Sequence, residues 1–178
     1  MFDLAIKTQR LTLRTYRLSD APRLRALVDD YEIAKMCGSI LHPYPDGEAE
    51  RWIGLHGARR ASGKGYPFAI ELDGHLAGSI GIEEDADGEA ELGCWFSPKH
   101  WNKGLASEAS AAVLRFGFGW RALTYVRARF QNDNSASERV LAKAGFLATE
   151  RYTEFHKVRA HDAQVTKVIL TRDAWIET

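Results

Sequence analysis

The fold of this chain is decided by the stretch Trp101-Asn102-Lys103-Gly104-Leu105-Ala106-Ser107-Glu108-Ala109. Before it, the strand-like run 91–96 predicts a strand, and after it residues 110–120 carry apolar side chains at helical spacing. The pattern therefore predicts a strand, a short loop with one glycine, and a helix whose first turn has small side chains. Free N–H groups at such a helix start, together with the helix dipole, favour an anion. We interpret the loop around Gly104 as a phosphate-binding site, and an ordinary strand-to-helix turn is the alternative.

Length and composition fit a single domain that covers residues 1–178. Of the 178 residues, 45% are hydrophobic, which is enough for a sizeable core. Lys+Arg and Asp+Glu both total 24, so the net charge gives no support for nucleic acid as a partner. The sequence shows no signal peptide and no apolar run of membrane length, so we expect a cytoplasmic protein without a membrane partner. Monomer and homodimer both remain open.

The cysteines and histidines form no metal-binding pattern. Cys37 and Cys94 are too few for a disulfide framework, and the six histidines include no pair at i, i+4. We therefore expect no metal. Because Cys94 lies in an apolar run beside Trp95 and Phe96, we expect a small core residue there rather than a nucleophile.

The remaining pattern predicts an α+β fold. Asp73-Gly74 and a turn around Asp87-Gly88 separate three strands, and the following units alternate strand, helix and strand. The expected strands are residues 10–16 (as an edge strand), 66–70, 75–82, 90–96, 123–130, 146–155 and 163–170. Together these units predict a mixed, twisted, mostly antiparallel sheet of about seven strands flanked by helices.

A second stretch, Asn134-Ser135-Ala136-Ser137-Glu138 onward to Lys143-Ala144-Gly145-Phe146, predicts a capped helix that ends at a glycine. With the first stretch, it resembles the GNAT N-acetyltransferase superfamily, whose acetyl-CoA loop reads Arg/Gln-x-x-Gly-x-Gly/Ala. Gly104 and Ala106 match this loop, but Trp101 stands where Arg or Gln is usual. Trp101 and the opening Thr8–Arg14 are similar to one branch, the bacterial ribosomal-protein N-terminal acetyltransferases. The resemblance covers nearly the whole chain.

The resemblance implies a site for acetyl-CoA. In the family, two neighbouring strands splay into a V, and the pantetheine arm enters between them. Strand backbone at Trp95 and Phe96 should then bind pantetheine amides as an added strand would, while N–H groups of residues 103–107 hold the pyrophosphate. The cofactor-binding residues that we expect are Trp95, Phe96, Ser97, Lys103, Gly104, Leu105, Ala106, Ser107, Asn134, Ser137 and Lys143.

The resemblance also implies an acceptor groove, with the loop 37–46 and the helix after it as one wall. Tyr44, Trp52 and Glu91 are the candidate acceptor-binding residues, although a plain surface connection is the alternative for the loop. Glu91 is our candidate general base, and a surface carboxylate at the end of an acidic run is its alternative.

The candidate for the proton donor departs from the family pattern. Many members use a tyrosine to protonate the leaving thiolate, but the matching position here is Leu141. Ser137, one helical turn earlier on the same face, is the nearest hydroxyl. Because serine is a weak acid, it could serve only to hydrogen-bond the sulfur or to orient a water.

We therefore expect an acetyl-CoA-dependent N-acetyltransferase that acts by direct attack in a ternary complex. The similarity of residues 10–14 and the Pro-rich loop to the ribosomal branch favours the α-amine of a protein or peptide. A small-molecule amine such as a polyamine, amino acid or antibiotic is the alternative, attracted by the eight carboxylates between Glu71 and Glu91. A non-catalytic acyl-CoA-binding module also remains open. A nucleotide-binding protein fits less well, because no Lys-Ser/Thr follows the loop glycine.

Overall fold

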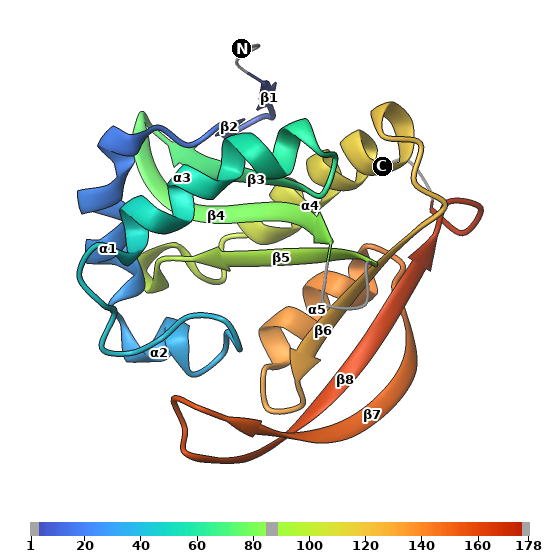
Figure 1. Ribbon diagram of the computed structural model, residues 1–178. Helices are drawn as coiled ribbons and strands as arrows, with labels where there is room; N and C mark the ends of the chain where they lie inside the picture. Colours follow the sequence, from blue (N-terminus) through green and yellow to red (C-terminus); the bar gives the residue numbers. More distant parts are fainter. Residues whose placement is uncertain (1–3, 85–88, 176–178) are drawn as a thin grey trace.

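One sheet of eight strands runs through the part of the chain that the computed structural model describes, residues 4–84 and 89–175 (Figure 1). The strand order is β1-β2-β3-β4-β5-β6-β8-β7, and only the β5–β6 pair is parallel among these neighbours. The strands are β1 (Ala5–Lys7), β2 (Leu11–Arg14), β3 (Gly65–Leu72), β4 (His75–Glu84), β5 (Ala90–Phe96), β6 (Tyr125–Gln131), β7 (Leu147–His156) and β8 (His161–Thr171). The predicted α+β class with a mixed, mostly antiparallel sheet is confirmed.

One detail of the predicted sheet is wrong. The described chain has eight strands, in line with the expected number of about seven, because β1 adds a strand before the first one that we expected. β1 pairs Ile6 with Leu13 of β2, so residues 10–16 do not form the edge of the sheet. With only three residues, β1 is too short for an alternating pattern to be recognised.

Helices cover both faces of the sheet. The helical segments are η1 (Leu18–Asp20), α1 (Ala21–Val28), α2 (Tyr31–Ala34), α3 (Glu48–Ala61), η2 (Pro98–His100), α4 (Leu105–Arg115), η3 (Phe116–Trp120) and α5 (Ser135–Lys143). α1 and α3 enclose one core cluster with the sheet, and α4 and α5 lie over the larger cluster on the other face (Figure 1). None of the described helices is both long enough and apolar enough to cross a membrane.

The central helix α4 is held by a stripe of buried side chains. Leu105, Ala109 and Val113 follow each other at intervals of four residues, and none exposes more than 3% of its surface. They pack against sheet residues such as Phe68 and Ile80 in the larger cluster. This stripe fixes the start of α4 beside the end of β5, where residues 101–109 were expected to form the phosphate loop.

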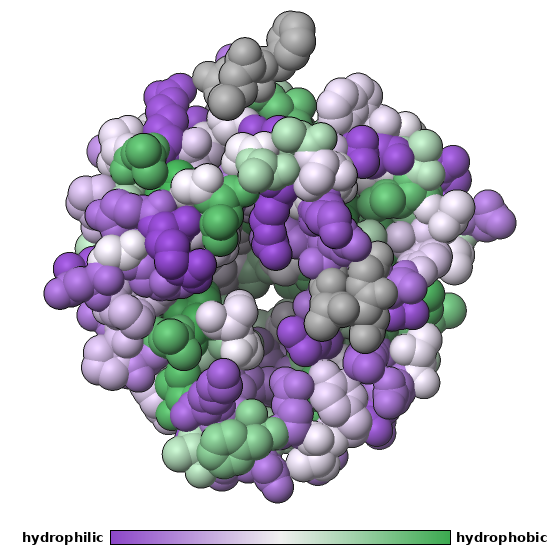
Figure 2. Space-filling model, in the orientation of Figure 1, coloured by the Kyte–Doolittle hydropathy of each residue, from purple (hydrophilic) through white to green (hydrophobic). Residues whose placement is uncertain are grey.

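β5 and β6 separate after a single pairing. Glu91 pairs with Arg127, and no further pair joins the two strands. β6 turns away and pairs along its whole length with β8. Seen in the orientation of Figure 1, Figure 2 shows an opening through the middle of the molecule, in the space between β5 and α5. The two strands therefore form a V with Glu91 and Arg127 at its apex, and we call the space between its arms the central opening.

Candidate active site

The predicted phosphate loop ends where α4 begins. Gly104 is the N-terminal cap of α4 with φ of 73°, a left-handed conformation that glycine adopts without strain. Lys103 and Gly104 are exposed, Ala106 and Ser107 are half-buried, and the Leu105 side chain is in the core. The small side chains leave the first N–H groups of an 11-residue helix open to a ligand. The loop thus fits a diphosphate such as that of CoA, with Leu105 able to contribute only its backbone.

A pair of residues that the sequence analysis did not assign to the site holds this loop from behind. The Glu108 carboxylate accepts hydrogen bonds from Thr8 Oγ1 at 2.6 Å and from Arg10 N at 2.8 Å and Nε at 2.7 Å. Arg10 Nη1 also donates to the Lys103 carbonyl at 2.9 Å. Burial alone would raise the pKa of Glu108, but these hydrogen bonds outweigh burial and lower it. The segment Thr8–Arg14 and the phosphate loop are therefore joined by one set of contacts.

Of the two residues whose backbone we expected to face the pantetheine, the strand register supports Phe96 but not Trp95. Ser97 N donates to Ala77 O at 2.9 Å, so the backbone groups of Ser97 and Trp95 point to β4. Because backbone directions alternate in an antiparallel pair, those of Cys94 and Phe96 point to the opening. We therefore transfer the expected pantetheine contact from the Trp95 backbone to that of Cys94.

Trp101 has a local structural role. Its indole Nε1 donates to the Phe96 carbonyl at 2.7 Å, so it joins the phosphate loop to the end of β5. This bond uses the Phe96 carbonyl and leaves the Phe96 N–H on the open side of the strand. The tryptophan that replaces the usual Arg or Gln thus orients the loop through an uncharged hydrogen bond.

The expectation that Cys94 is a core residue is wrong. Cys94 shares a face of β5 with the buried residues Leu92 and Phe96, but its own surface is exposed. The alternation of the strand places it correctly beneath α4 and α5, and the central opening leaves it uncovered. Although the opening exposes its surface, the protein atoms around Cys94 desolvate the thiol and raise its pKa to about 12, so it is protonated and unsuited to act as a nucleophile.

The start of α5 faces the same opening. Asn134 Oδ1 accepts a hydrogen bond from Ser137 N at 3.0 Å, as expected for an N-terminal cap. Leu141 is buried in the larger core cluster, and Ser137, one turn earlier on that face, is half-buried. Lys143 is exposed in the last turn of α5, about 9 Å from Ser137 along the helix axis. The structure thus brings Asn134 and Ser137 to one site and leaves Lys143 at the far end of α5.

Charged side chains meet near the apex of the V. Glu91 Oε1 lies 3.2 Å from Arg129 Nε, and Arg129 Nη1 lies 3.8 Å from Glu154 Oε2. Tyr152 donates its hydroxyl to the same Glu154 oxygen at 3.4 Å. Burial would lower the pKa of Arg129, but Glu91, Tyr152 and Glu154 together raise it. Glu91 is therefore part of an ionic cluster, which we call the apex cluster: Glu91, Arg129, Tyr152 and Glu154.

The candidate acceptor residues gather on the opposite side of the sheet from α4. Two of them, Tyr44 and Trp52, are partly buried against the smaller core cluster, as is Trp95 of β5. The Trp52 ring meets those of Tyr16 and His56 edge-on, at centroid distances of 5.1 and 4.2 Å, so its main contact is packing. Tyr44 N donates to Asp29 Oδ1 at 2.8 Å, which fixes the Pro-rich loop. Tyr44 is thus the better candidate for the acceptor wall, because the main contact of Trp52 is packing in the same cluster.

Two carboxylates of the acidic run before β5 are paired with basic side chains. Glu83 forms an ion pair with Arg59, and Glu84 lies 3.5 Å from Lys64 Nζ. Asp85 and Asp87 lie outside the described residues. The attraction that this run could exert on a cationic amine is weakened by these pairs. In residues 4–84 and 89–175, no group of three or more His, Cys, Asp or Glu side chains could hold a metal ion.

Comparison with known proteins agrees with this geometry. Residues 10–147 match the family model of the acetyltransferase (GNAT) domain. The N-acetyltransferase YoaA of Bacillus subtilis is 31% identical over 174 residues, covering 94% of this chain and 98% of YoaA. Mycobacterium smegmatis RimJ in complex with CoA-disulfide has a TM-score of 0.83 at 21% identity, covering 97% of this chain and 89% of RimJ. The ribosomal α-N-protein acetyltransferase RimL in complex with coenzyme A has a TM-score of 0.84 at 17% identity, covering 96% and 99%.

The fold, the loop at α4 and the matched family model define an acyl-CoA-dependent transferase. This chain belongs to the GNAT acetyltransferase family, and the resemblance inferred from Gly104 and Asn134 is confirmed.

Proposed function

We propose that this enzyme acetylates the α-amine of a protein or peptide N-terminus, using acetyl-CoA in a ternary complex. The observation that carries the proposal is the central opening, which has the loop at α4 on one face and the acceptor candidates on the other. A through-passage lets a thioester and an amine approach each other from opposite faces. The N-terminal acetyltransferase activity in the name of RimL supports the choice of acceptor.

The cofactor has matching groups along its length. N–H groups of residues 103–107 bind the pyrophosphate, and the open backbone edge of Cys94 and Phe96 pairs with the pantetheine amides. Asn134 and Ser137 line the other side of the pantetheine, and Lys143 lies toward the adenine. RimL and RimJ, which were solved with CoA or CoA-disulfide, support this arrangement.

The reaction needs one proton acceptor and one proton donor. Glu91, which lies 3.2 Å from Arg129, accepts a proton from the acceptor ammonium, and the free amine nitrogen attacks the thioester carbonyl carbon. A C–N bond forms, the C–S bond breaks, and the sulfur leaves as a thiolate. The thiolate gains a proton from a water that Ser137 orients or from the Ser137 hydroxyl itself. The second proton, which the nitrogen loses as the amide forms, then replaces the one that this donor gave up.

An α-amine suits this limited machinery. Its pKa near 7.7–8.0 leaves it partly neutral at neutral pH, whereas a lysine amine near 10.4 needs about 4 kcal/mol to lose its proton at about pH 7.5. A carboxylate is a much weaker base than either amine, so Glu91 can deprotonate the first amine more readily than the second.

The acceptor is tested by intact-mass measurement of ribosomal and other abundant proteins from a strain that lacks this gene. The proposal predicts that at least one protein loses N-terminal acetylation and regains it when purified enzyme and acetyl-CoA are added. If every N-terminus keeps its acetylation state, the N-terminal proposal fails and a small-molecule amine becomes the leading acceptor. We also propose a cytoplasmic location, because free thiols at Cys37 and Cys94 are typical of reducing compartments.

A further inference from the structure

Arg159 makes an unusual set of contacts for a residue in a hairpin turn. It lies between β7 and β8, yet only 10% of its side chain is exposed. Its Nη1 and Nη2 lie 2.6 and 3.2 Å from the two carboxylate oxygens of Asp133. Nε donates to the Lys35 carbonyl at 2.7 Å, and Nη2 lies 3.2 Å from Met36 Sδ. One guanidinium therefore joins three segments that are far apart in the sequence.

The segments that Arg159 joins belong to the two arms of the V. β5 and β6 diverge from Glu91 and Arg127, and β6 ends two residues before Asp133. Lys35 and Met36 follow α2 directly and lead into the loop whose Ile40 and Tyr44 pack against the same cluster as Trp95 of β5. Arg159 thus connects the loop beside β5 to the end of β6. It closes the wide end of the V.

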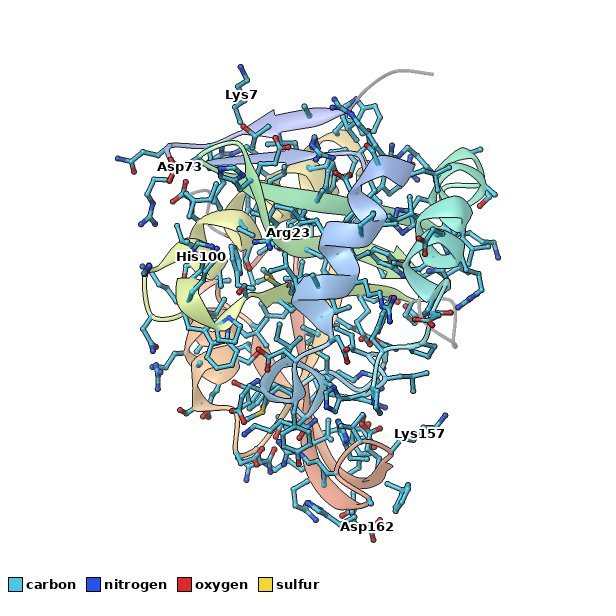
Figure 3. All side chains as sticks on the ribbon, turned by 90° about the vertical axis from the view of Figure 1, so that its left-hand side faces the viewer. Lys7, Arg23, Asp73, His100, Lys157 and Asp162 are labelled. Carbon is cyan, nitrogen blue, oxygen red and sulfur yellow. The ribbon has the colours of Figure 1, made fainter. Side chains whose placement is uncertain are left out.

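The figures agree with this placement. In Figure 1 the turn between β7 and β8 lies below α2, on the side where the V is wide. Figure 3 shows Lys157 and Asp162, which flank Arg159 in the chain, at the same lower end of the molecule with their side chains directed outward. Arg159 instead donates to the Lys35 carbonyl, just after α2, and to Asp133 in the β6–α5 loop.

Each end of the contact leads to a residue of the proposed site. Asp133 immediately precedes Asn134, whose side chain caps Ser137 at 3.0 Å. On the other end, Met36 leads to Gly38, where an added Cβ would lie 3.9 Å from Glu154 Oε1 of the apex cluster. A shift at Arg159 would therefore move the start of α5, which carries Ser137, together with the loop after α2.

We propose that Arg159 is a positioning residue that closes the V and holds the acceptor wall, residues 35–46, in register with the start of α5. The inference rests on the proposed function for its kinetic consequence but not for its structural one. While the Arg159 contacts are intact, the amine and the thioester meet in a central opening of fixed width. Without it, the two walls move independently, the amine is poorly placed, and water reaches the thioester.

The test uses the full-length Arg159→Lys variant, which keeps the positive charge but lacks the planar fork that reaches three acceptors. Arg151→Lys is the matched control, because Arg151 is exposed on the same hairpin. The first readout is hydrogen exchange measured by mass spectrometry on the protein without substrate. We expect exchange in both segments 35–46 and 131–137 to become about tenfold faster in Arg159→Lys, as the loss of a charge-assisted hydrogen bond implies, and to stay unchanged in Arg151→Lys.

Steady-state kinetics provide the second readout. Arg159→Lys should raise the KM for the amine by about tenfold and increase acetyl-CoA hydrolysis in the absence of amine. Its affinity for CoA should change less than about twofold, because the phosphate loop at α4 is held by Arg10 and Glu108 instead. A general loss of structure would weaken both substrates equally, so the split between them separates positioning from damage.

A second variant, Asp133→Asn, removes the charge of the partner and keeps its shape. If Arg159 and Asp133 act as one contact, the double variant exchanges no faster than Arg159→Lys alone. Faster exchange confined to residues 157–160, or additive effects in the double variant, would overturn the proposal. A wild-type enzyme that acetylates no amine would refute the proposed function, while the exchange data would still decide whether Arg159 joins the two walls.

Discussion

Glu108 Oε2 accepts a hydrogen bond of 2.7 Å from Arg10 Nε, and this contact joins residues 98 positions apart in the chain. The same guanidinium donates to the Lys103 carbonyl, so one arginine fixes both the loop and the first turn of α4. A carbonyl held from behind turns the N–H groups of the loop outward. The ion pair also cancels a negative charge that would otherwise oppose a phosphate at the helix start.

Replacing Arg10 by glutamine should weaken CoA binding by about fivefold to tenfold, since it frees the loop and leaves Glu108 uncompensated. Calorimetry with CoA measures this change. The control is Arg25→Gln, which breaks the ion pair between Arg25 and Asp46 on the other face of the sheet at a similar exposure. Equal CoA affinity in both variants would show that Arg10 has no part in forming the phosphate site.

Gly104→Val should lower CoA affinity by at least about tenfold, because several backbone hydrogen bonds to an ionised acceptor are disturbed together. Gly47→Val is a matched control: Gly47 caps α3 with φ of 75°, against 73° for Gly104. Both variants carry a similar backbone strain of about 1–2 kcal/mol, so their melting temperatures should fall alike. The phosphate assignment is wrong if CoA affinity is unchanged in Gly104→Val.

Glu91→Gln should lower turnover by at least about 10²-fold at neutral pH, the usual contribution of a positioned proton acceptor. Raising the pH should restore part of the rate, because an α-amine with a pKa near 7.7–8.0 then loses its proton unaided. The measurement is turnover from about pH 6.5 to about 9, with Glu150→Gln on β7 as control. If Glu91→Gln turns over as fast as the wild type over this whole range, Glu91 has no part in the mechanism and catalysis is left to proximity.

The stability of the fold should fall in mild acid because of His56. This ring is buried against Tyr16 and Trp52, and neither nitrogen has a hydrogen-bond partner. Burial, with Arg60 and Arg59 nearby, lowers the pKa of His56 from 6.5 to about 4. Between these values the unfolded chain binds a proton that the folded chain does not, so stability decreases as the pH falls from about 6.5 to about 4.

The loss should reach about 3 kcal/mol, at 1.36 kcal/mol per pKa unit. Urea unfolding at several pH values measures it. His56→Phe should show a smaller slope with pH across this window, whereas His75→Phe, at an exposed position, should keep the slope of the wild type. An unchanged slope in His56→Phe would mean that another group is responsible for the acid sensitivity.

Local patterns predicted the parts of the site that are made locally. The Gly104 loop and the Asn134 cap depend on residues within one turn of each other, so their spacing is visible in the sequence. The class of the sheet could be predicted for the same reason, because hairpin turns and strand–helix–strand units are local. Cys94 shows where this stops: alternation predicts its face, but whether a helix covers that face depends on how far β5 and β6 diverge.

Contacts between distant segments left no local pattern. Arg129 meets Glu91 and Glu154 from three different strands, and Arg159 reaches Asp133 and Lys35 across 26 and 124 positions. Long-range ion pairs of this kind carry no fixed spacing, so composition and periodicity cannot reveal them. The resemblance of Thr8–Arg14 to a known branch marked that segment as relevant, and only the structure shows its contact with Glu108.

The central claim is acetyl transfer to an α-amine through the central opening, and a transfer assay on paired peptides tests it most directly. Purified enzyme is mixed with acetyl-CoA and a lysine-containing peptide whose N-terminus is either free or already acetylated, and both released thiol and peptide mass are measured. We predict one thiol released for each acetyl group gained by the free peptide, and none with the blocked peptide. CoA binding without thiol release on this peptide or any amine tried would contradict transferase activity, and equal transfer to the blocked peptide would contradict the choice of the α-amine.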